Sequence, residues 1–230
     1  MADAIGQSVA TIRAVVSAGG SVAYLAMDEP FVSGRSAVCG GPALEPTADR
    51  VATYMAGVRA AYPEVRIGWI EAYPFSDEPA IEAALDLLRA RNATPAFLHV
   101  DVDSRALARA GADFTRDMRA LRAACAARQV PFGMIIWGYN GDADTLYALD
   151  AERVVNQMSA AFSRWDDMPD HIVFQSWAQT AAELWLTPSN LPETRSYTHT
   201  NLLMETYRRL RGQTGPAIGT AIPRLSLIHI

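Results

Sequence analysis

The chain has 230 residues, 50% of them hydrophobic and 20% charged, with a formal net charge of −5 at pH 7. Such a composition can build a sizeable globular core. The basic residues do not form a stripe along the sequence, which argues against nucleic acid as a partner. No apolar run approaches the about 20 residues of a membrane span, so we expect a soluble chain that does not bind membranes. No signal-peptide pattern opens the chain. The compartment stays open, and secretion of a longer protein is one alternative.

A helical pattern over Ile5–Val16 comes first, and short apolar runs then alternate with helix-period stretches. The predicted strands are Ser21–Met27, Val65–Ile70, Ala96–Val100, Phe132–Trp137 and His171–Phe174. The predicted later helices are Thr47–Tyr62, Glu78–Arg91, Asp113–Arg128, Asp150–Trp165 and Thr198–Arg211. We expect Thr47 to cap the first of these and Gly212 to end the last. The order is one helix followed by five strand–helix units.

The predicted strands are near-continuously apolar, which is typical of parallel strands buried on both faces. An open doubly wound sheet would give the same order of elements. However, no strand is followed by a Gly-rich phosphate loop, and every strand ends in polar or aromatic residues, as in barrel active sites. We therefore predict an α/β fold, a partial (β/α)₈ TIM barrel of about five βα units with parallel strands.

The end of the chain sets the expected domain limits. Leu225–Ile230 resembles the translation of a transposase adapter used in sequencing libraries. We expect one incomplete barrel domain over residues 1–224 and a non-native tail over 225–230, as in a metagenomic fragment. Three missing strands would leave open sheet edges, so the fragment is expected to be insoluble, swapped or inactive. The oligomeric state stays open. Cys39 and Cys125 lack a metal-site spacing and are expected to be free thiols.

Asp28-Glu29-Pro30, after the first strand, is the sharpest chemical feature. A carboxylate at the end of a buried strand is partly desolvated, which raises its pKa and suits it to general acid catalysis. Pro30 forces an extended exit from the strand. The alternative is that Asp28 or Glu29 only caps the following loop.

Further carboxylates follow the next two strands. Glu71 ends the second strand and could approach the about 5–5.5 Å separation of a retaining glycosidase pair. Asp101 and Asp103 end the third strand and better fit the about 6.5–9.5 Å of an inverting pair. The alternative is structural: the two aspartates would be equally expected in a turn or just before the start of a helix. His99, within the third strand, is an inward barrel residue that either bonds a neighbour or lines the site.

Aromatic and amide side chains gather at the same strand ends. Sugar rings pack their C–H faces on aromatic rings, and their hydroxyls bind amides and carboxylates. The aromatic residues are Trp69, Tyr73, Trp137, Tyr139 and Trp177, and the amides are Asn140 and Gln175. Together with the carboxylates they favour a saccharide cleft.

Metal and cofactor chemistry receives little support from the sequence. Asp101, Asp103, Asp142 and Asp144 could offer oxygen ligands. The spacing of Asp142 and Asp144 does not complete a calcium loop, which also needs a terminal Glu. We expect no metal site and no cofactor.

Two of these motifs resemble clan A of the (β/α)₈ glycoside hydrolases. Asp28-Glu29-Pro30 is similar to the Asn-Glu-Pro motif at the fourth strand of that clan, where the Glu is the acid/base. Gln175-Ser176-Trp177 is similar to the eighth strand, whose Trp often floors the sugar site. The resemblance implies that the chain carries strands four to eight. Two departures stand out: Asp28 replaces Asn, and the seventh strand ends in Trp137-Gly138-Tyr139-Asn140 instead of a nucleophilic Glu.

These observations favour a glycoside hydrolase-like protein acting on a saccharide. In this hypothesis Glu29 is the proton donor and Glu71 or Asp101 is the partner carboxylate. The substrate would be bound by Asp28, Tyr73, His99, Asp103, Trp137, Tyr139, Asn140, Gln175 and Trp177. The alternatives are a noncatalytic carbohydrate-binding barrel and a metal-assisted hydrolase.

Overall fold

The computed structural model describes residues 2–138, 144–162, 167–175, 199–212 and 224–227. The helices are α1 (Ala2–Ser17), α2 (Leu44–Ala61), α3 (Glu78–Ala90), α4 (Ser104–Ala110), α5 (Phe114–Ala127), α6 (Asp144–Ala161) and α8 (His199–Gly212), with a 3-10 turn η1 (Ala37–Cys39). The strands are β1 (Tyr24–Asp28), β2 (Arg66–Tyr73), β3 (Leu98–Val102), β4 (Phe132–Ile136), β5 (His171–Phe174) and β6 (Arg224–Leu227).

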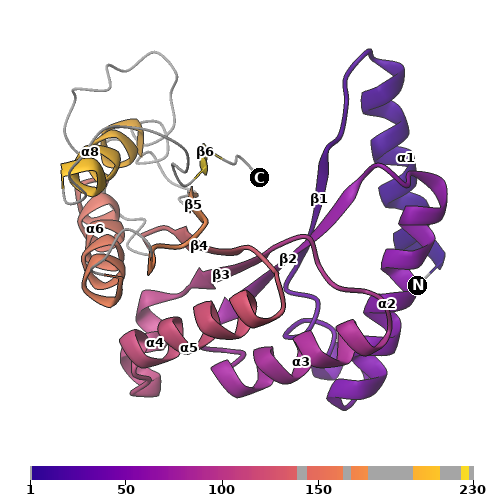
Figure 1. Cartoon of the computed structure of the whole chain (residues 1–230), viewed down its shortest axis with the longest axis horizontal. Helices are drawn as coiled ribbons and strands as arrows, with labels where there is room; N and C mark the ends of the chain where they lie inside the picture. Colours follow the sequence, from indigo (N-terminus) through magenta and orange to yellow (C-terminus); the bar gives the residue numbers. More distant parts are fainter. Residues whose placement is uncertain (1, 139–143, 163–166, 176–198, 213–223, 228–230) are drawn as a thin grey trace.

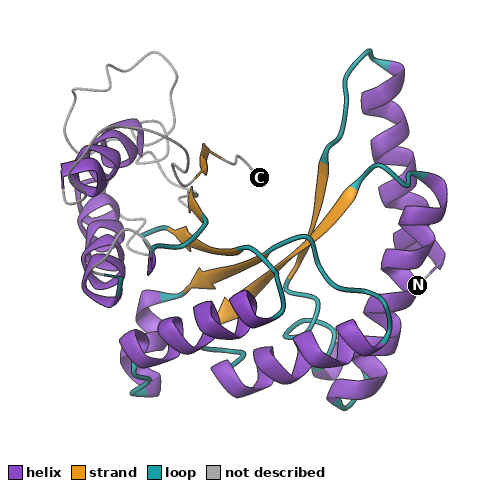
Figure 2. Ribbon diagram, in the orientation of Figure 1, coloured by secondary structure: helices purple, strands orange, loops and turns teal. Residues whose placement is uncertain are grey.

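The strands form one parallel sheet in chain order, β1-β2-β3-β4-β5-β6. The sheet curls, and the helices that connect its strands lie on its convex side (Figures 1 and 2). This arrangement is a curled half-barrel and confirms the predicted α/β fold with about five parallel βα units. A helical crossover connects consecutive strands, because a tight turn cannot join two parallel strands.

The bounds of β2 differ from the prediction in a way that matters for the site. β2 continues to Tyr73, since Glu71 pairs with Val100 and Tyr73 pairs with Val102 of β3. Glu71 is therefore a strand residue and does not follow the strand. The expected end at Ile70 was wrong because a polar residue was read as a terminus, although a carboxylate with enough hydrogen-bond donors can lie inside a sheet.

Two helix starts also differ. Thr47 is not an N-cap: α2 begins at Leu44, and the Thr47 hydroxyl donates back to the Ala43 carbonyl at 3.0 Å. The helix expected from Asp150 begins at Asp144. α4 was not predicted, because its seven residues are too few to show a helical period.

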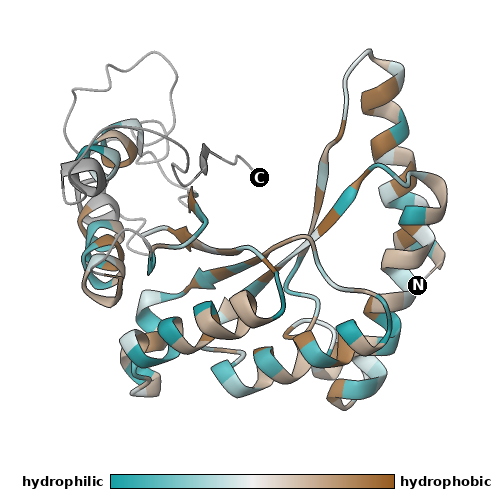
Figure 3. Cartoon of the chain, viewed as in Figure 1, coloured by the Kyte–Doolittle hydropathy of each residue, from teal (hydrophilic) through white to brown (hydrophobic). Residues whose placement is uncertain are grey.

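The two faces of the sheet differ in what covers them. Strand residues alternate between the faces. On the outer face, side chains such as Ile67, Trp69 and Met134 join helix residues in the main hydrophobic core. On the inner face, Ile70, Ile135, Trp137 and Val173 form a second, smaller cluster made of strand-side residues alone. Figure 3 shows brown, hydrophobic stretches interrupted by teal, polar ones on the strands as well as on the helices.

Two glycines let aromatic rings lie flat on the inner face. A Cβ at Gly68 would come within 2.1 Å of the Phe97 ring, and a Cβ at Gly133 within 2.4 Å of the His99 ring. Phe97 stacks on His99 with ring centroids 4.1 Å apart. The absence of these two side chains therefore makes room for a compact aromatic layer on β3, between Gly68 of β2 and Gly133 of β4.

The sheet ends at β1 on one side and at β6 on the other. β6 pairs with β5, from Arg224 opposite His171 to Leu227 opposite Phe174. A strand thus covers part of the segment 225–230 that the sequence analysis set apart from the fold, while the origin of that segment stays a prediction. Among the described helices, none is long and apolar enough to cross a bilayer. Both cysteines are free thiols: Cys39 is exposed and Cys125 is buried.

Candidate functional site

Asp28 and Glu29 lie where β1 leaves the sheet, and Asp28 is exposed while Glu29 is half-buried. Glu29 adopts a left-handed backbone conformation with φ 46°. Its amide donates to the Ile70 carbonyl at 2.9 Å, and its carboxylate accepts from the Ser33 hydroxyl at 3.5 Å. Partial burial raises the pKa of both carboxyls, and the neighbouring Asp28 charge raises the pKa of Glu29 further. The strand end thus presents two carboxyls whose pKa values both lie above those of free side chains.

Asp101 is the most buried carboxylate on the inner face, with 6% of its surface exposed. It lies in β3, and its Oδ1 accepts a hydrogen bond from the Trp137 indole at the end of β4. Burial raises the pKa of Asp101 to about 7, opposed by the indole bond and assisted by the charges of Glu29, Asp28 and Asp103. Asp101 therefore lies within electrostatic range of the β1 carboxylates and exchanges a proton near neutral pH.

Glu71 does not join this group, because its side chain lies on the outer face. It is fully buried, and its Oε2 accepts from the Trp69 indole at 2.7 Å and from the Phe31 amide at 3.1 Å. Its Oε1 accepts from the Val32 amide at 2.9 Å. Burial raises the pKa of Glu71 to about 7, and these three donors oppose the rise. The carboxylate is thus occupied by the protein's own N–H groups.

Tyr73 and Asp103 also have structural partners away from the inner face. Tyr73 is fully buried on the outer face, and its hydroxyl donates to the Asp117 carboxylate of α5 at 2.6 Å. Asp103 caps α4, accepting from the Arg105 and Ala106 amides at 2.9 Å each. This capping is the helix-approach alternative considered for Asp103 from the sequence.

His99 faces inward and pairs with a histidine that sequence reasoning had not singled out. Its Nε2 lies 2.9 Å from Nδ1 of His171, while its own buried Nδ1 has no hydrogen-bond partner among the described residues. Burial lowers the pKa of His99 to about 3, and the His171 charge lowers it further. Period-two alternation along β5 could have flagged His171, because it shares the inner face with Gln175.

Of the expected sugar-binding side chains, Trp137 and Gln175 lie at inner-face strand ends. Trp137 is 9% exposed and Gln175 is 2% exposed. The Gln175 backbone N–H donates to the Ile136 carbonyl at 3.1 Å, next to the pair of Ile136 and Phe174 that ends the β4–β5 ladder. Tyr139, Asn140 and Trp177 lie outside the described residues. Trp69, expected at the same rim, instead packs on the outer face against Phe31, with ring centroids 4.8 Å apart.

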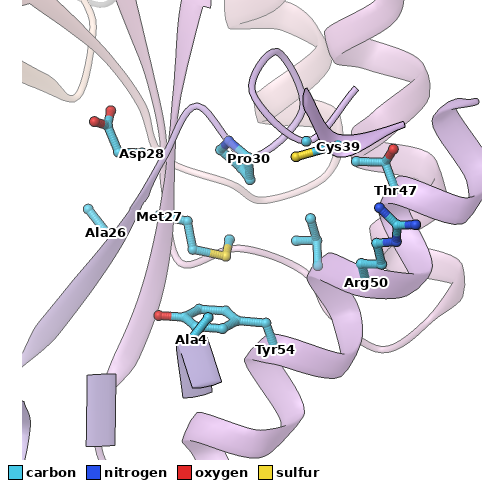
Figure 4. A pocket seen from close by; sticks show the side chains of 11 residues that line it. Ala4, Ala26, Met27, Asp28, Pro30, Cys39, Thr47, Arg50 and Tyr54 are labelled. Carbon is cyan, nitrogen blue, oxygen red and sulfur yellow. The ribbon is translucent and has the colours of Figure 1, made fainter. Parts of the chain in front are cut away.

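A cavity of about 540 Å³ lies beside β1, toward α1 and α2 (Figure 4). Most of its lining is apolar, and the lining residues with polar side chains include Asp28, Thr47, Arg50 and Tyr54. In Figure 4, Met27 points toward the cavity and Asp28 points to the other side of β1. The cavity therefore reaches the end of β1, where Asp28 belongs to its lining although the Asp28 carboxylate points away from it.

No protein-family model matches the chain, and the search of curated proteins found no match either. Within the described part of the chain, no three His, Cys, Asp or Glu side chains are grouped so that they could hold a metal ion. The group of Asp28, Glu29, Asp101 and Trp137 is defined by the indole–carboxylate hydrogen bond and by the charges of Asp28 and Glu29 that raise the pKa of Asp101.

Proposed function

We propose that the inner face of the half-barrel, at the carboxyl ends of its strands, binds a saccharide and hydrolyses a glycosidic bond. The single observation that carries the proposal is Asp101, a buried carboxylate held by an indole within electrostatic range of Asp28 and Glu29. Barrel enzymes assemble their active sites at this end of the strands. The resemblance of Asp28-Glu29-Pro30 to clan A glycoside hydrolases supports hydrolysis of a glycosidic bond, although it implies a different role for Glu29.

Asp101 and Glu29 are the proposed catalytic pair. Of two carboxyls in one site, the group with the higher pKa holds the proton and acts as the general acid. Burial raises the pKa of Asp101 to about 7, so Asp101 is the donor to the leaving group. Glu29 is less buried and acts as the base that activates water. This assignment reverses the role that the motif alone gave to Glu29.

The strand order supports an inverting rather than a retaining reaction. β1 and β3 lie on either side of β2. Two inter-strand spacings of about 4.8 Å separate them by roughly 10 Å at the backbone. Carboxylates of β1 and β3 that leaned toward each other across this distance would match the about 6.5–9.5 Å separation that leaves room for a water molecule.

Leaving-group dependence tests the two roles in the 230-residue chain. A panel of p-nitrophenyl glycosides first identifies the sugar, and phenyl and 2,4-dinitrophenyl glycosides of that sugar are then compared. Asp101→Asn should lower kcat on the phenyl glycoside about 10²–10⁴-fold, because that leaving group needs a proton. The kcat of Asp101→Asn should fall much less on the dinitrophenyl glycoside, whereas the kcat of Glu29→Gln should fall on both substrates. Glu64→Gln, an exposed acidic residue away from the site, is the control.

The pH profile gives a second measure of the same roles. A general acid must be protonated, so kcat/KM should fall above about pH 7, the pKa of Asp101, and this limb should vanish in Asp101→Asn. If Asp101→Asn and Glu29→Gln both kept the turnover of the wild type, the catalytic residues would lie outside this pair. Calorimetric binding of a sugar without hydrolysis would instead select the noncatalytic binding barrel, which the non-carboxylate Trp137 at the end of β4 favours.

A further inference from the structure

The turn that carries Glu29 is held almost entirely by two consecutive residues of β2. The Glu29 amide donates to the Ile70 carbonyl, and the Phe31 and Val32 amides donate to the Glu71 carboxylate. Pro30 has no backbone N–H and therefore needs no acceptor. Every backbone N–H from residue 29 to residue 32 is therefore accounted for by β2.

The held conformation is one that glutamate seldom adopts. Glu29 has φ 46°, and left-handed geometry costs a residue with a Cβ free energy that the surrounding contacts must offset. The next hydrogen bond, from the Ser33 amide to the Glu29 carbonyl at 2.9 Å, closes the turn around this residue. The position of the Glu29 side chain thus depends on bonds that residues 31–33 make.

We propose that Glu71 is a positioning residue that fixes the Glu29 carboxylate by bridging the Phe31 and Val32 amides to the Trp69 indole. For its effect on catalysis this inference rests on the proposed function; for the turn itself it rests on the hydrogen bonds alone. The role differs from the catalytic one expected for Glu71, because its carboxylate is buried on the outer face.

The bridge requires a carboxylate and not merely a polar side chain of that length. Three N–H groups converge on its two oxygens. A glutamine offers one oxygen and one NH₂, so it would direct donors at donors and leave at least one buried N–H unpaired. Protonation of Glu71 would add a donor in the same way. Glu29 is the charged group that acts on Glu71 from the facing turn, and it raises the pKa of Glu71 as burial does.

Amide NMR on the full chain tests the bridge without reference to activity. In the wild type, the Phe31 and Val32 amide resonances should shift with pH around a midpoint near 7, the pKa of Glu71. In Glu71→Gln this transition should be absent, and hydrogen exchange of these two amides should be at least about tenfold faster. The Val100 amide, in the core of β3, should exchange as in the wild type, and Glu64→Gln should change neither property.

Trp69→Phe is the second variant, and it keeps both amide bonds. Loss of the indole donor should move the midpoint to higher pH, because that bond lowers the pKa of Glu71. An unchanged midpoint in Trp69→Phe, or exchange that accelerates equally at Val100 in Glu71→Gln, would overturn the inference. The first result would remove the indole from the bridge, and the second would make Glu71 a general stability residue.

The catalytic arm uses the glycoside that the wild type hydrolyses. Glu71→Gln should lower kcat roughly 10–100-fold with KM within about twofold, because a displaced base misplaces the attacking water. Faster amide exchange with unchanged kcat in Glu71→Gln would overturn the positioning role, while the hydrogen bonds of the bridge would stand. A wild type without hydrolase activity would overturn the proposed function alone, since the NMR results stand independently.

Discussion

Glu71 and Asp101 are two similar carboxylates on opposite faces of neighbouring strands. Both are buried, both accept an indole N–H, and burial raises the pKa of each to about 7. Glu71 faces the helices, where backbone amides of the β1 turn occupy it. Asp101 faces inward, where its charged neighbours are the carboxylates of Asp28, Glu29 and Asp103. A perturbed pKa therefore marks both a structural bridge and a candidate catalytic group, and the partners decide which is which.

The largest expected change in the free energy of unfolding comes from replacing Asp101. The folded-state pKa of Asp101, about 7, lies above its usual value of 3.8, so the folded state binds the proton more tightly. Stability is therefore highest below pH 3.8, falls as the pH rises toward 7, and stays low above it. Asp101→Asn should consequently raise the free energy of unfolding at pH 8 by roughly 2–4 kcal/mol while reducing activity. Urea unfolding at pH 8 and pH 4 measures this gain, which should shrink at pH 4. A variant that is less stable at pH 8 would show that Asp101 is held as a structural ion.

A smaller, opposite pH dependence should come from the aromatic layer of the inner face. The pKa of His99 is lowered from 6.5 to about 3, so the unfolded chain binds the extra proton and stability falls as the pH drops below 6.5. The loss should reach about 2 kcal/mol at pH 5. His99→Gln should flatten this part of the stability curve, measured by urea midpoints between pH 8 and pH 5. Equal acid sensitivity in the variant would assign the effect to other groups.

The smallest expected effect concerns the left-handed residue of the β1 turn. Glu29→Gly and Glu29→Ala both remove the carboxylate, but only glycine is free of the steric cost at φ 46°. The glycine variant should be more stable than the alanine variant by about 1 kcal/mol. Thermal unfolding of the matched pair gives this difference directly. Equal stabilities would mean that the turn relaxes when Glu29 is replaced.

The sequence predicted the half-barrel because its signals are local and repeated. Five apolar runs separated by helical periods indicate parallel strands, and all five appear in the sheet. Strand ends were less predictable. The pattern predicts an end at Ile70 because Glu71 is a lone charge in an apolar run. The three donors that allow it inside the strand come from distant or outer-face residues.

The candidate site was predicted in part, for the same reason. Asp28, Glu29, Asp101 and Trp137 were found because they lie at strand ends in the sequence. Which side of the strand each side chain takes depends on register, and a shift of one residue moves it to the other face. Glu71 and Tyr73 were therefore grouped with Asp101, although they face the helices.

The sequence by itself determined the order of elements, the parallel sheet and the concentration of carboxylates and aromatics near the strand ends, because hydrophobic periodicity and residue type are properties of short segments. Only the tertiary structure decided that Asp101 faces inward, within electrostatic range of Glu29, while Glu71 faces outward and accepts hydrogen bonds from the turn that carries Glu29. The physical reason is that the partners of a buried carboxylate come from other strands and turns. Their distance along the chain, 40 residues between Phe31 and Glu71, leaves no local pattern to identify them.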